Sequence, residues 1–291
     1  MVETRSPTQE ARIAMTHPIP LLDANGMKMP RIGLGTWPMK GAECQAAVES
    51  ALSLGYRHVD TAEMYGNEDA VGAGIAASGL PRGDVFLTTK VWWDKPDGAA
   101  IRRAFDASLV RLATPYVDLL LIHWPSPELQ LADALKALAA IRAEGRARNI
   151  GVSNFPPGLL QRAIAEGETL ACLQVECHLM LDQSKLLGIC RAAGMALTAY
   201  SPLAKGANLD LPAVRQVAAK HGATLAQVAL AWLLAQEGVA MVPKAASPAR
   251  QKENLGALGV TLDAADLAVL AALPKDRRFV NPAFAPDWAQ G

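Results

Sequence analysis

Four polar residues at the ends of predicted strands carry the pattern with the clearest chemistry. Asp60 closes a short β-like run, and Tyr65 follows five residues later in a predicted turn. Lys90 lies near the end of the next strand-like run, and His123 lies near the end of the one after it. A phenol has a reference pKa of ~10 and donates a proton poorly at neutral pH. A neighbouring ammonium lowers that pKa, so the pattern predicts a tuned proton donor.

The three neighbours of Tyr65 have complementary tasks if they share its site. A carboxylate at Asp60 keeps the Lys90 ammonium protonated in a partly dry site, and the ammonium stabilises the phenolate. A neutral His123 hydrogen-bonds a substrate carbonyl oxygen. Together they predict proton donation to an oxygen that gains charge, as when a hydride attacks a carbonyl. Taken singly, His123 reads as a core histidine, Lys90 as a surface charge and Asp60 as a turn cap.

Eight strand-like runs alternate with helical patterns and must position these residues. The runs cover residues 31–37, 56–61, 85–92, 117–124, 149–154, 171–177, 195–200 and 239–244. Apolar residues recur between them at three- and four-residue steps, most clearly over 101–112, 131–141 and 225–235. This alternation predicts an α/β protein built as a (β/α)8 TIM barrel. An open doubly wound sheet is the alternative, but the Gly33-x-Gly35 pair lacks the third glycine of the dinucleotide fingerprint.

The two ends of the chain lie outside these units. Residues 1–16 are polar and lack periodicity, so we expect a disordered leader there, with Met15 as an alternative start. Asn25-Gly26 between two apolar runs predicts an N-terminal β-hairpin. A further helix is expected over 263–272, after the last barrel helix. The tail then carries apolar residues that must pack on the barrel mouth or the barrel side, namely Phe279, Phe284 and Trp288.

Composition excludes several classes of protein. The 291 residues are 51% hydrophobic and have a formal net charge of +0, with no basic block that would bind nucleic acid. No window approaches ~18 consecutive apolar residues and no secretory h-region opens the chain, so we expect a cytoplasmic protein without a membrane span. No linker divides residues 17–291, which we expect to form a single domain. The four cysteines lack CxxC spacing, and Cys177-His178 lacks the second ligand pair of a metal site.

Six segments together resemble the aldo-keto reductase family. They are Asp60-Thr61-Ala62-x-x-Tyr65-x-Asn67-Glu68, Thr88-Thr89-Lys90, Leu121-Ile122-His123-Trp124-Pro125, Gly151-Val152-Ser153-Asn154-Phe155, Gln174-Val175-Glu176-Cys177-His178 and Ala199-Tyr200-Ser201-Pro202-Leu203. They follow the family's order, and the resemblance covers about residues 19–288. By resemblance, Tyr65 is the general acid toward the carbonyl, Lys90 and Asp60 tune it, and His123 orients the substrate. The compact loops resemble the bacterial 2,5-diketo-D-gluconate and methylglyoxal reductases.

The resemblance implies NADP(H) as the cofactor and suggests which residues hold its nicotinamide end. In the family these are polar residues at strand ends, an aromatic residue that stacks on the ring, and residues just beyond it. The matching positions are Asp60, Ser153, Asn154, Gln174, Tyr200, Ser201 and Leu203. Tyr200 corresponds to the stacking aromatic.

A second set of positions matches the adenosine end of the same cofactor. The residues that correspond to the contacts of the 2′-phosphate and adenine are Lys244, Ala245, Arg250, Glu253 and Asn254. Lys244 and Arg250 also suit a phosphate on chemical grounds, because both are cations near a strand end or helix start. Ala245 stands where many relatives have a serine, so one phosphate donor is missing.

Large aromatic residues just beyond the strand runs predict a mostly apolar pocket. With Tyr65 and His123, the expected substrate-binding residues are Trp37, Trp92 and Trp124. The predicted function is NADPH-dependent reduction of aldehydes and ketones to alcohols by a monomeric enzyme. Small α-dicarbonyls, keto-sugar acids and aromatic aldehydes are the expected substrates, and no metal is expected.

Two other functions fit parts of the pattern. A Schiff-base lyase or aldolase on a similar barrel would use Lys90 as its nucleophile. A nicotinamide-binding sensor with low turnover would keep the cofactor residues and lose the need for the proton donor. The complete set of Asp60, Tyr65, Lys90 and His123 favours the reductase over both.

Overall fold

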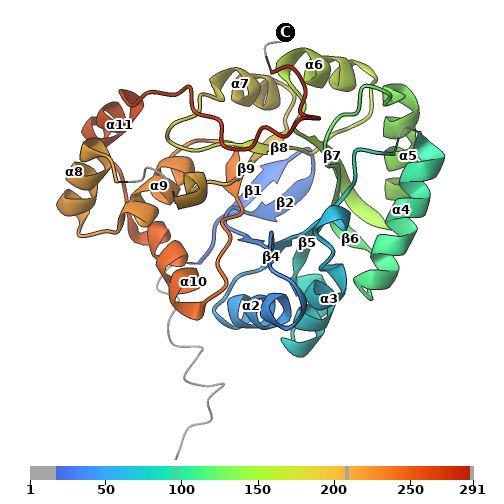
Figure 1. Cartoon of the computed structure of the whole chain (residues 1–291), viewed down its shortest axis with the longest axis horizontal. Helices are drawn as coiled ribbons and strands as arrows, with labels where there is room; N and C mark the ends of the chain where they lie inside the picture. The colour runs from blue at the N-terminus through green and yellow to red at the C-terminus, as the bar shows by residue number, and fades with distance from the viewer. Residues whose placement is uncertain (1–17, 96, 207–209, 289–291) are drawn as a thin grey trace, which may run out of the picture.

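The structure is a computed structural model that describes residues 18–95, 97–206 and 210–288. At its centre eight strands lie side by side in chain order, all parallel (Figure 1). They are β3 Leu34–Gly35, β4 His58–Asp60, β5 Phe86–Val91, β6 Val117–Ile122, β7 Ala147–Ser153, β8 Cys172–Glu176, β9 Ala196–Tyr200 and β10 Val239–Met241. Each overlaps one of the eight predicted runs, so the predicted strands are confirmed.

The sheet closes between β3 and the chain that follows β10. The backbone N–H of Gly33 donates to the Met241 carbonyl at 2.8 Å, and that of Gly35 donates to the Pro243 carbonyl at 3.1 Å. Gly35 allows this close approach, because a Cβ there would lie 2.5 Å from the Val242 carbonyl oxygen. The closed ring of parallel strands confirms the predicted (β/α)8 TIM barrel.

Helices surround the barrel, and each strand from β3 onward is followed by at least one (Figure 1). They are α2 Gly41–Ser53, α3 Glu68–Ala77, α4 Gly98–Arg111, α5 Leu131–Ala143, α6 Pro157–Ala165, α7 Ser184–Ala192, α8 Pro212–His221, α9 Leu225–Leu234, α10 Pro248–Leu255 and α11 Ala264–Ala271. Capping boxes start two of them: Thr224 with Gln227 at α9, and Asp263 with Asp266 at α11. The expected helix over 263–272 is α11.

A β-hairpin closes one end of the barrel. Strands β1 Leu21–Ala24 and β2 Met27–Pro30 pair antiparallel around Asn25 and Gly26, which both have positive φ, as a tight hairpin turn requires. Met27 and Met29 are fully buried and pack against the inward-facing side chains of β6, β8 and β9. The hairpin lies at the centre of the ring in Figure 1. Ligands must therefore enter at the opposite end, where the strands finish.

The C-terminal tail lies across that open end. Lys275 O accepts from the backbone N–H of Asp182 at 2.9 Å, and the N–H of Arg277 donates to Met180 O at 2.9 Å. In Figure 1 the chain runs on from α11 past α7 toward β7 and α6. The sequence left the barrel mouth and the barrel side open as packing sites, and the tail occupies the mouth.

Several expectations remain outside what the structure decides. The expected leader over residues 1–16 lies outside the described residues, and a single domain over 17–291 stays a prediction. Monomeric state and cytoplasmic location also stay predictions.

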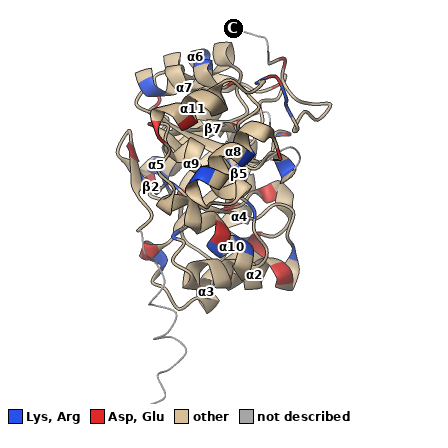
Figure 2. Ribbon diagram, turned by 90° about the vertical axis from the view of Figure 1, so that its left-hand side faces the viewer, with Lys and Arg blue, Asp and Glu red and all other residues tan. Residues whose placement is uncertain are grey.

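The four cysteines are free and buried. Lysines, arginines and acidic residues are interspersed on the helices of the side drawn in Figure 2.

No single helix among the described residues is long and apolar enough to cross a membrane. The helices α8 and α9 meet that criterion only when taken together, across a bend of 88°.

Candidate active site

Neighbouring strands bring Asp60, Lys90 and Tyr65 together at the open end of the barrel. The fully buried Lys90 Nζ donates to Asp60 Oδ1 at 2.6 Å, to Thr61 O at 2.9 Å and to Tyr65 Oη at 3.4 Å. Asp60 is paired with Thr88 across β4 and β5. Lys90 lies two residues beyond Thr88, and side chains two residues apart on a strand share one face. The three N–H groups of the ammonium therefore each have an acceptor.

The environment of Lys90 keeps its side chain charged. Burial alone would lower the pKa of this ammonium, but the charges of Asp60 and Tyr65 and their hydrogen bonds act against burial and raise it above its ordinary value. A Schiff-base nucleophile needs a neutral amine with a free lone pair. The geometry around Lys90 therefore disfavours the aldolase alternative.

The pKa of Tyr65 differs from the expectation. Burial raises the pKa of the phenol, the charge of Lys90 lowers it, and the net direction is upward. Lys90 lowers the pKa as predicted, but the net direction is upward, because the loss of water and the nearby Asp60 carboxylate outweigh the ammonium. Tyr65 is held as a neutral phenol, which is the form that donates a proton.

His123 completes the group immediately after β6. Its ring centroid lies 5.5 Å from that of Tyr65 and 5.1 Å from that of Trp92. Burial and the positive charge of Lys90 hold the pKa of His123 well below its usual value, so the imidazole is neutral as expected. Its Nδ1 is buried and has no hydrogen-bond partner among the described residues. We call Asp60, Tyr65, Lys90 and His123 the strand-end tetrad.

Amide side chains connect the strand-end tetrad to the predicted nicotinamide positions. Gln174 Nε2 donates to Asp60 Oδ2 at 2.7 Å, and Asn154 Nδ2 donates to His123 O at 2.9 Å. Tyr200 Oη donates to Asn154 Oδ1 at 2.8 Å. Asn154 has a φ of 62°, a left-handed conformation that asparagine tolerates better than most residues. These contacts hold the amides and the Tyr200 ring in fixed positions before any ligand arrives.

The other predicted nicotinamide residues have different surroundings. Ser153 is fully buried at the end of β7, where its Oγ accepts from Asn154 Nδ2 at 3.0 Å. Ser201 lines the mouth and has a φ of 47°, an uncommon conformation for serine that often occurs at functional sites. Leu203 packs against the hydrophobic core and is not among the residues that line the mouth pocket.

The predicted phosphate and adenine residues lie beyond β10, in the segment before α10 and along α10 itself. Lys244 is exposed, and the Arg250 side chain is 72% exposed while its Nη1 bonds Glu253 Oε2 at 2.6 Å. Ala245 is buried in the core. Asn254 Nδ2 is buried without a hydrogen-bond partner among the described residues. Two exposed cations near the start of a helix fit a phosphate.

A cavity of about 600 Å³ lies above the strand-end tetrad. Tyr65 and His123 are at its base, and the expected tryptophans Trp37, Trp92 and Trp124 form its walls. Its other lining residues are Met64, Asn154, Gln174, Tyr200, Ser201, Lys205, Phe279, Val280, Asn281, Pro282 and Phe284. The tail residues could not be assigned to the pocket from sequence, although their aromatic side chains indicated that the tail packs against something.

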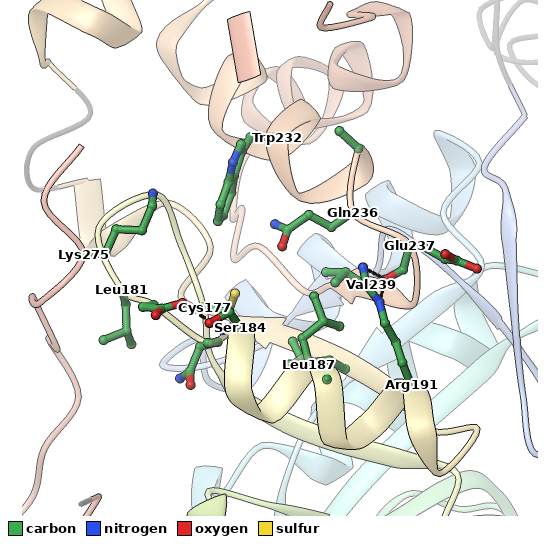
Figure 3. A pocket seen from close by; sticks show the side chains of 15 residues that line it. Cys177, Leu181, Ser184, Leu187, Arg191, Trp232, Gln236, Glu237, Val239 and Lys275 are labelled. Atoms are coloured by element: carbon green, nitrogen blue, oxygen red, sulfur yellow. Dashed lines mark hydrogen bonds between the residues drawn. The ribbon is translucent and has the colours of Figure 1, made fainter. Parts of the chain in front are cut away.

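A second cavity of about 590 Å³ lies outside the barrel, between α7, α9 and the strands β9 and β10 (Figure 3). Two of the charged side chains that line it bond backbone carbonyl groups. Lys275 Nζ donates to Leu179 O at 2.9 Å, and Arg191 Nη2 donates to Glu237 O at 2.8 Å. We therefore place the chemistry in the mouth cavity, which contains Tyr65 and His123.

Comparison with known proteins agrees with this site. The model of the Aldo/keto reductase family matches residues 31–274. Methylglyoxal reductase DkgB of Escherichia coli O157:H7 is 40% identical over 267 residues, which cover 90% of this chain and 100% of that protein. A crystal structure described as a 2,5-diketo-D-gluconic acid reductase B has a TM-score of 0.90 at 42% identity, and the match covers 94% of this chain and 98% of that chain.

A third relative carries a cofactor. It is an aldo-keto reductase crystallised as a complex with NADPH, with a TM-score of 0.86 at 30% identity over 94% of this chain and 95% of that chain. The family model spans most of the sequence, and the relatives match over nearly their full length. The chain belongs to the aldo/keto reductase family.

Proposed function

We propose that this protein reduces aldehydes and ketones to alcohols with NADPH. The observation that carries the proposal is the neutral Tyr65 phenol, 3.4 Å from a charged Lys90 and beside His123 at the base of a cavity of about 600 Å³. A carbonyl oxygen that contacts both Tyr65 and His123 would have two hydrogen-bond donors. NADPH supplies the hydride when it is bound.

The residues of the strand-end tetrad have separate tasks in this proposal. Tyr65 gives its proton to the carbonyl oxygen as charge develops there. Lys90, held in place by Asp60, stabilises the phenolate that forms. His123 orients the carbonyl by donating the one N–H of its neutral ring, which we place on Nε2 because Nδ1 is buried and cannot reach the cavity. The buried position of Lys90 strengthens its effect on Tyr65, since little water screens the charge.

The proposed cofactor contacts follow the two groups of residues described above. Ser153, Asn154 and Gln174 would bind the nicotinamide amide, and Tyr200 would stack on the ring, with Ser201 beside it. Lys244 and Arg250 would bind the 2′-phosphate, and Glu253 and Asn254 the adenine. Ala245 has only a methyl group as its side chain, so it contributes no side-chain donor to the phosphate. We propose a preference for NADPH that rests on the two cations.

The pocket supports small or flat substrates. Trp37, Trp92 and Trp124 offer apolar faces, and polar groups gather at the base of the cavity. Small α-dicarbonyls such as methylglyoxal, keto-sugar acids and aromatic aldehydes all fit this arrangement. The relative that is named a methylglyoxal reductase supports the first of these classes.

A substrate panel tests the proposal directly. Methylglyoxal, 2,5-diketogluconate and an aromatic aldehyde would each be incubated with the protein and NADPH, and then with NADH, while cofactor oxidation is followed by absorbance. We expect turnover of at least one substrate and a higher kcat/KM with NADPH. Borohydride treatment in the presence of a carbonyl substrate is the control for aldolase chemistry. Trapping of the substrate on Lys90, without cofactor oxidation, would refute the reductase proposal.

A further inference from the structure

Glu176 holds the C-terminal tail by its backbone. This glutamate ends β8 and is completely buried. Its Oε1 accepts from the N–H of Phe279 at 2.7 Å, and its Oε2 accepts from the N–H of Val280 at 2.9 Å. We propose that Glu176 is a positioning residue that fixes tail residues 279–284 as the roof of the carbonyl pocket and thereby sets which larger substrates are bound. This inference rests on the proposed reductase function.

His178 shows that Glu176 acts as a charged acceptor. Met180 N donates to His178 Nδ1 at 3.3 Å, so the ring proton belongs on Nε2, which lies 3.0 Å from Glu176 Oε1. Burial raises the pKa of Glu176. The hydrogen bonds from His178 and the two tail amides lower it by more, so the net direction is downward. The guanidinium of Arg278 adds positive charge at 4.0 Å. A buried carboxylate with three N–H donors is well satisfied and resists displacement.

Beyond the backbone bond of Arg277 to Met180, residues 279–284 of the tail are held at two places. Glu176 binds it at residues 279–280, and an aromatic cluster binds it at Phe284. The Phe284 ring stacks on Trp93 at 5.1 Å and makes edge contacts with Trp92 at 5.4 Å and Trp124 at 5.5 Å. Asn281 and Pro282, between the two points, line the pocket. Lys205 Nζ also donates to Phe279 O at 3.0 Å, so release of the Glu176 bonds would loosen residues 279–282 while Lys205 and Phe284 still hold the tail.

Glu176 shares its strand with Gln174, the amide that bonds the strand-end tetrad. Gln174 and Glu176 are two residues apart on β8, so both side chains point to the same face. Gln174 bonds Asp60 in the tetrad, whereas Glu176, further toward the mouth, bonds the tail. Changes at Glu176 should therefore reach the roof of the pocket without moving Tyr65 or Lys90.

The test is Glu176→Gln, which keeps the shape of the side chain and removes its charge. An NH₂ group then replaces one acceptor, opposite an N–H donor of the tail. Charge-assisted hydrogen bonds stabilise the attached tail, so their loss should speed exchange of the backbone amides of residues 277–284 about tenfold, as measured by hydrogen–deuterium exchange. The KM of a bulky aromatic aldehyde should rise about tenfold, because such a substrate contacts the roof. The kcat and KM of methylglyoxal should stay within about twofold, because it is held at the base.

Glu49→Gln is the matched control, since Glu49 is an exposed carboxylate on α2. It should change neither exchange nor KM. Unchanged tail exchange in Glu176→Gln, or equal losses for both substrates, would overturn the inference. If Glu176→Gln does not fold, Val280→Pro removes one N–H donor from the tail and must raise the KM of the aromatic aldehyde selectively. If the wild-type protein reduces no carbonyl, the proposed function fails, and tail exchange still decides whether Glu176 holds the roof.

Discussion

The base and the rim of the pocket are built in opposite ways. The base consists of the strand-end tetrad with Gln174 and Asn154, and Lys90 and Asp60 within it are 0% and 3% exposed. Its polar atoms bond one another through short contacts such as the 2.6 Å pair of Lys90 and Asp60. We define the rim as Trp37 and the tail, which line the cavity, together with the cations Lys244 and Arg250, which lie beyond β10 and are not among its lining residues. Trp37 is 48% exposed, and the Arg250 side chain is 72% exposed.

This difference separates chemistry from selection. Buried charges are stable only when each has a partner, so the base is organised by the fold itself, and a single lost partner is costly. Exposed charges are screened by water and salt, so each contributes modestly and can be changed without loss of the fold. We therefore expect variants of the base to affect the reaction or stability, and variants of the rim to affect which cofactor or substrate is bound.

The largest expected effect is that of Tyr65→Phe. The substitution removes the phenol oxygen, while Lys90 keeps its bonds to Asp60 and Thr61. Loss of the proton donor should lower kcat by about 10³-fold, as for other general acids. The phenyl ring still fills the space beside Trp37, but Lys90 loses its longest contact, at 3.4 Å, so the free energy of unfolding should fall by about 1–3 kcal/mol.

Steady-state kinetics and denaturant unfolding measure the two effects on the same sample, and cofactor fluorescence checks that NADPH still binds. A Tyr65→Phe enzyme with full activity would refute the mechanism. If Tyr65→Phe lowers kcat no more than a rim variant does, the distinction between base and rim does not hold.

A second prediction concerns His58, a buried histidine below the base, two residues before Asp60 on β4. Burial holds its pKa at about 4, compared with an ordinary value of 6.5. The unfolded chain takes up a proton near 6.5, whereas the folded protein resists it until about pH 4, so stability falls as pH decreases between these values. At about 1.4 kcal/mol per pH unit, the contribution lost is roughly 3 kcal/mol.

The measurement compares wild type with His58→Asn by chemical unfolding from pH 7.5 to pH 4. The variant is less stable at neutral pH, because it loses the contact with Phe86, but it should lose less stability on acidification. Other titrating groups are common to both proteins and cancel in the difference. A difference in unfolding free energy that is constant with pH would show that His58 titrates normally and that the base is more open to water than its burial indicates.

The base was predictable from sequence because it follows from the barrel. Polar residues that end successive parallel strands meet at one edge, so Asp60, Lys90 and His123 had to lie close together once the strands were recognised. Tyr65 lies in the short helical turn that follows β4, only five residues from Asp60. The net direction of the Tyr65 pKa was missed, because it depends on how completely the pocket excludes water.

The rim was less predictable because it is assembled from distant segments. The hydrogen bond from Phe279 to Glu176 joins residues 103 positions apart, and no local sequence pattern predicts it. The aromatic side chains of the tail indicated that it would pack somewhere, but the position depended on a buried carboxylate that sequence alone presents as one residue of a strand. Likewise, the burial of Ala245 depends on how α10 packs beyond β10. The pairing of Arg250 with Glu253, by contrast, is a local i,i+3 contact on α10.

The smallest expected effect lies in the rim, at Arg250. Its guanidinium is exposed, and Nη1 donates to Glu253 Oε2. A 2′-phosphate would therefore compete with this carboxylate for the guanidinium. We expect Arg250→Ala to raise the KM for NADPH about tenfold, the value of one partly screened charge-assisted hydrogen bond, and to leave the KM for NADH within about twofold. Added salt should reduce the difference in the KM for NADPH between wild type and variant, because salt screens the exposed charge of Arg250.

Arg215→Ala is the matched control, since Arg215 is another exposed arginine paired with a carboxylate, Asp210, at 2.6 Å. It should change neither KM. Equal losses for NADPH and NADH in Arg250→Ala would place Arg250 outside the 2′-phosphate site. A large fall in kcat would be more serious, because it would mean that a residue of the rim acts on the chemistry at the base. A selective, salt-sensitive change in the KM for NADPH, with kcat unchanged, is the result that the separation of base and rim requires.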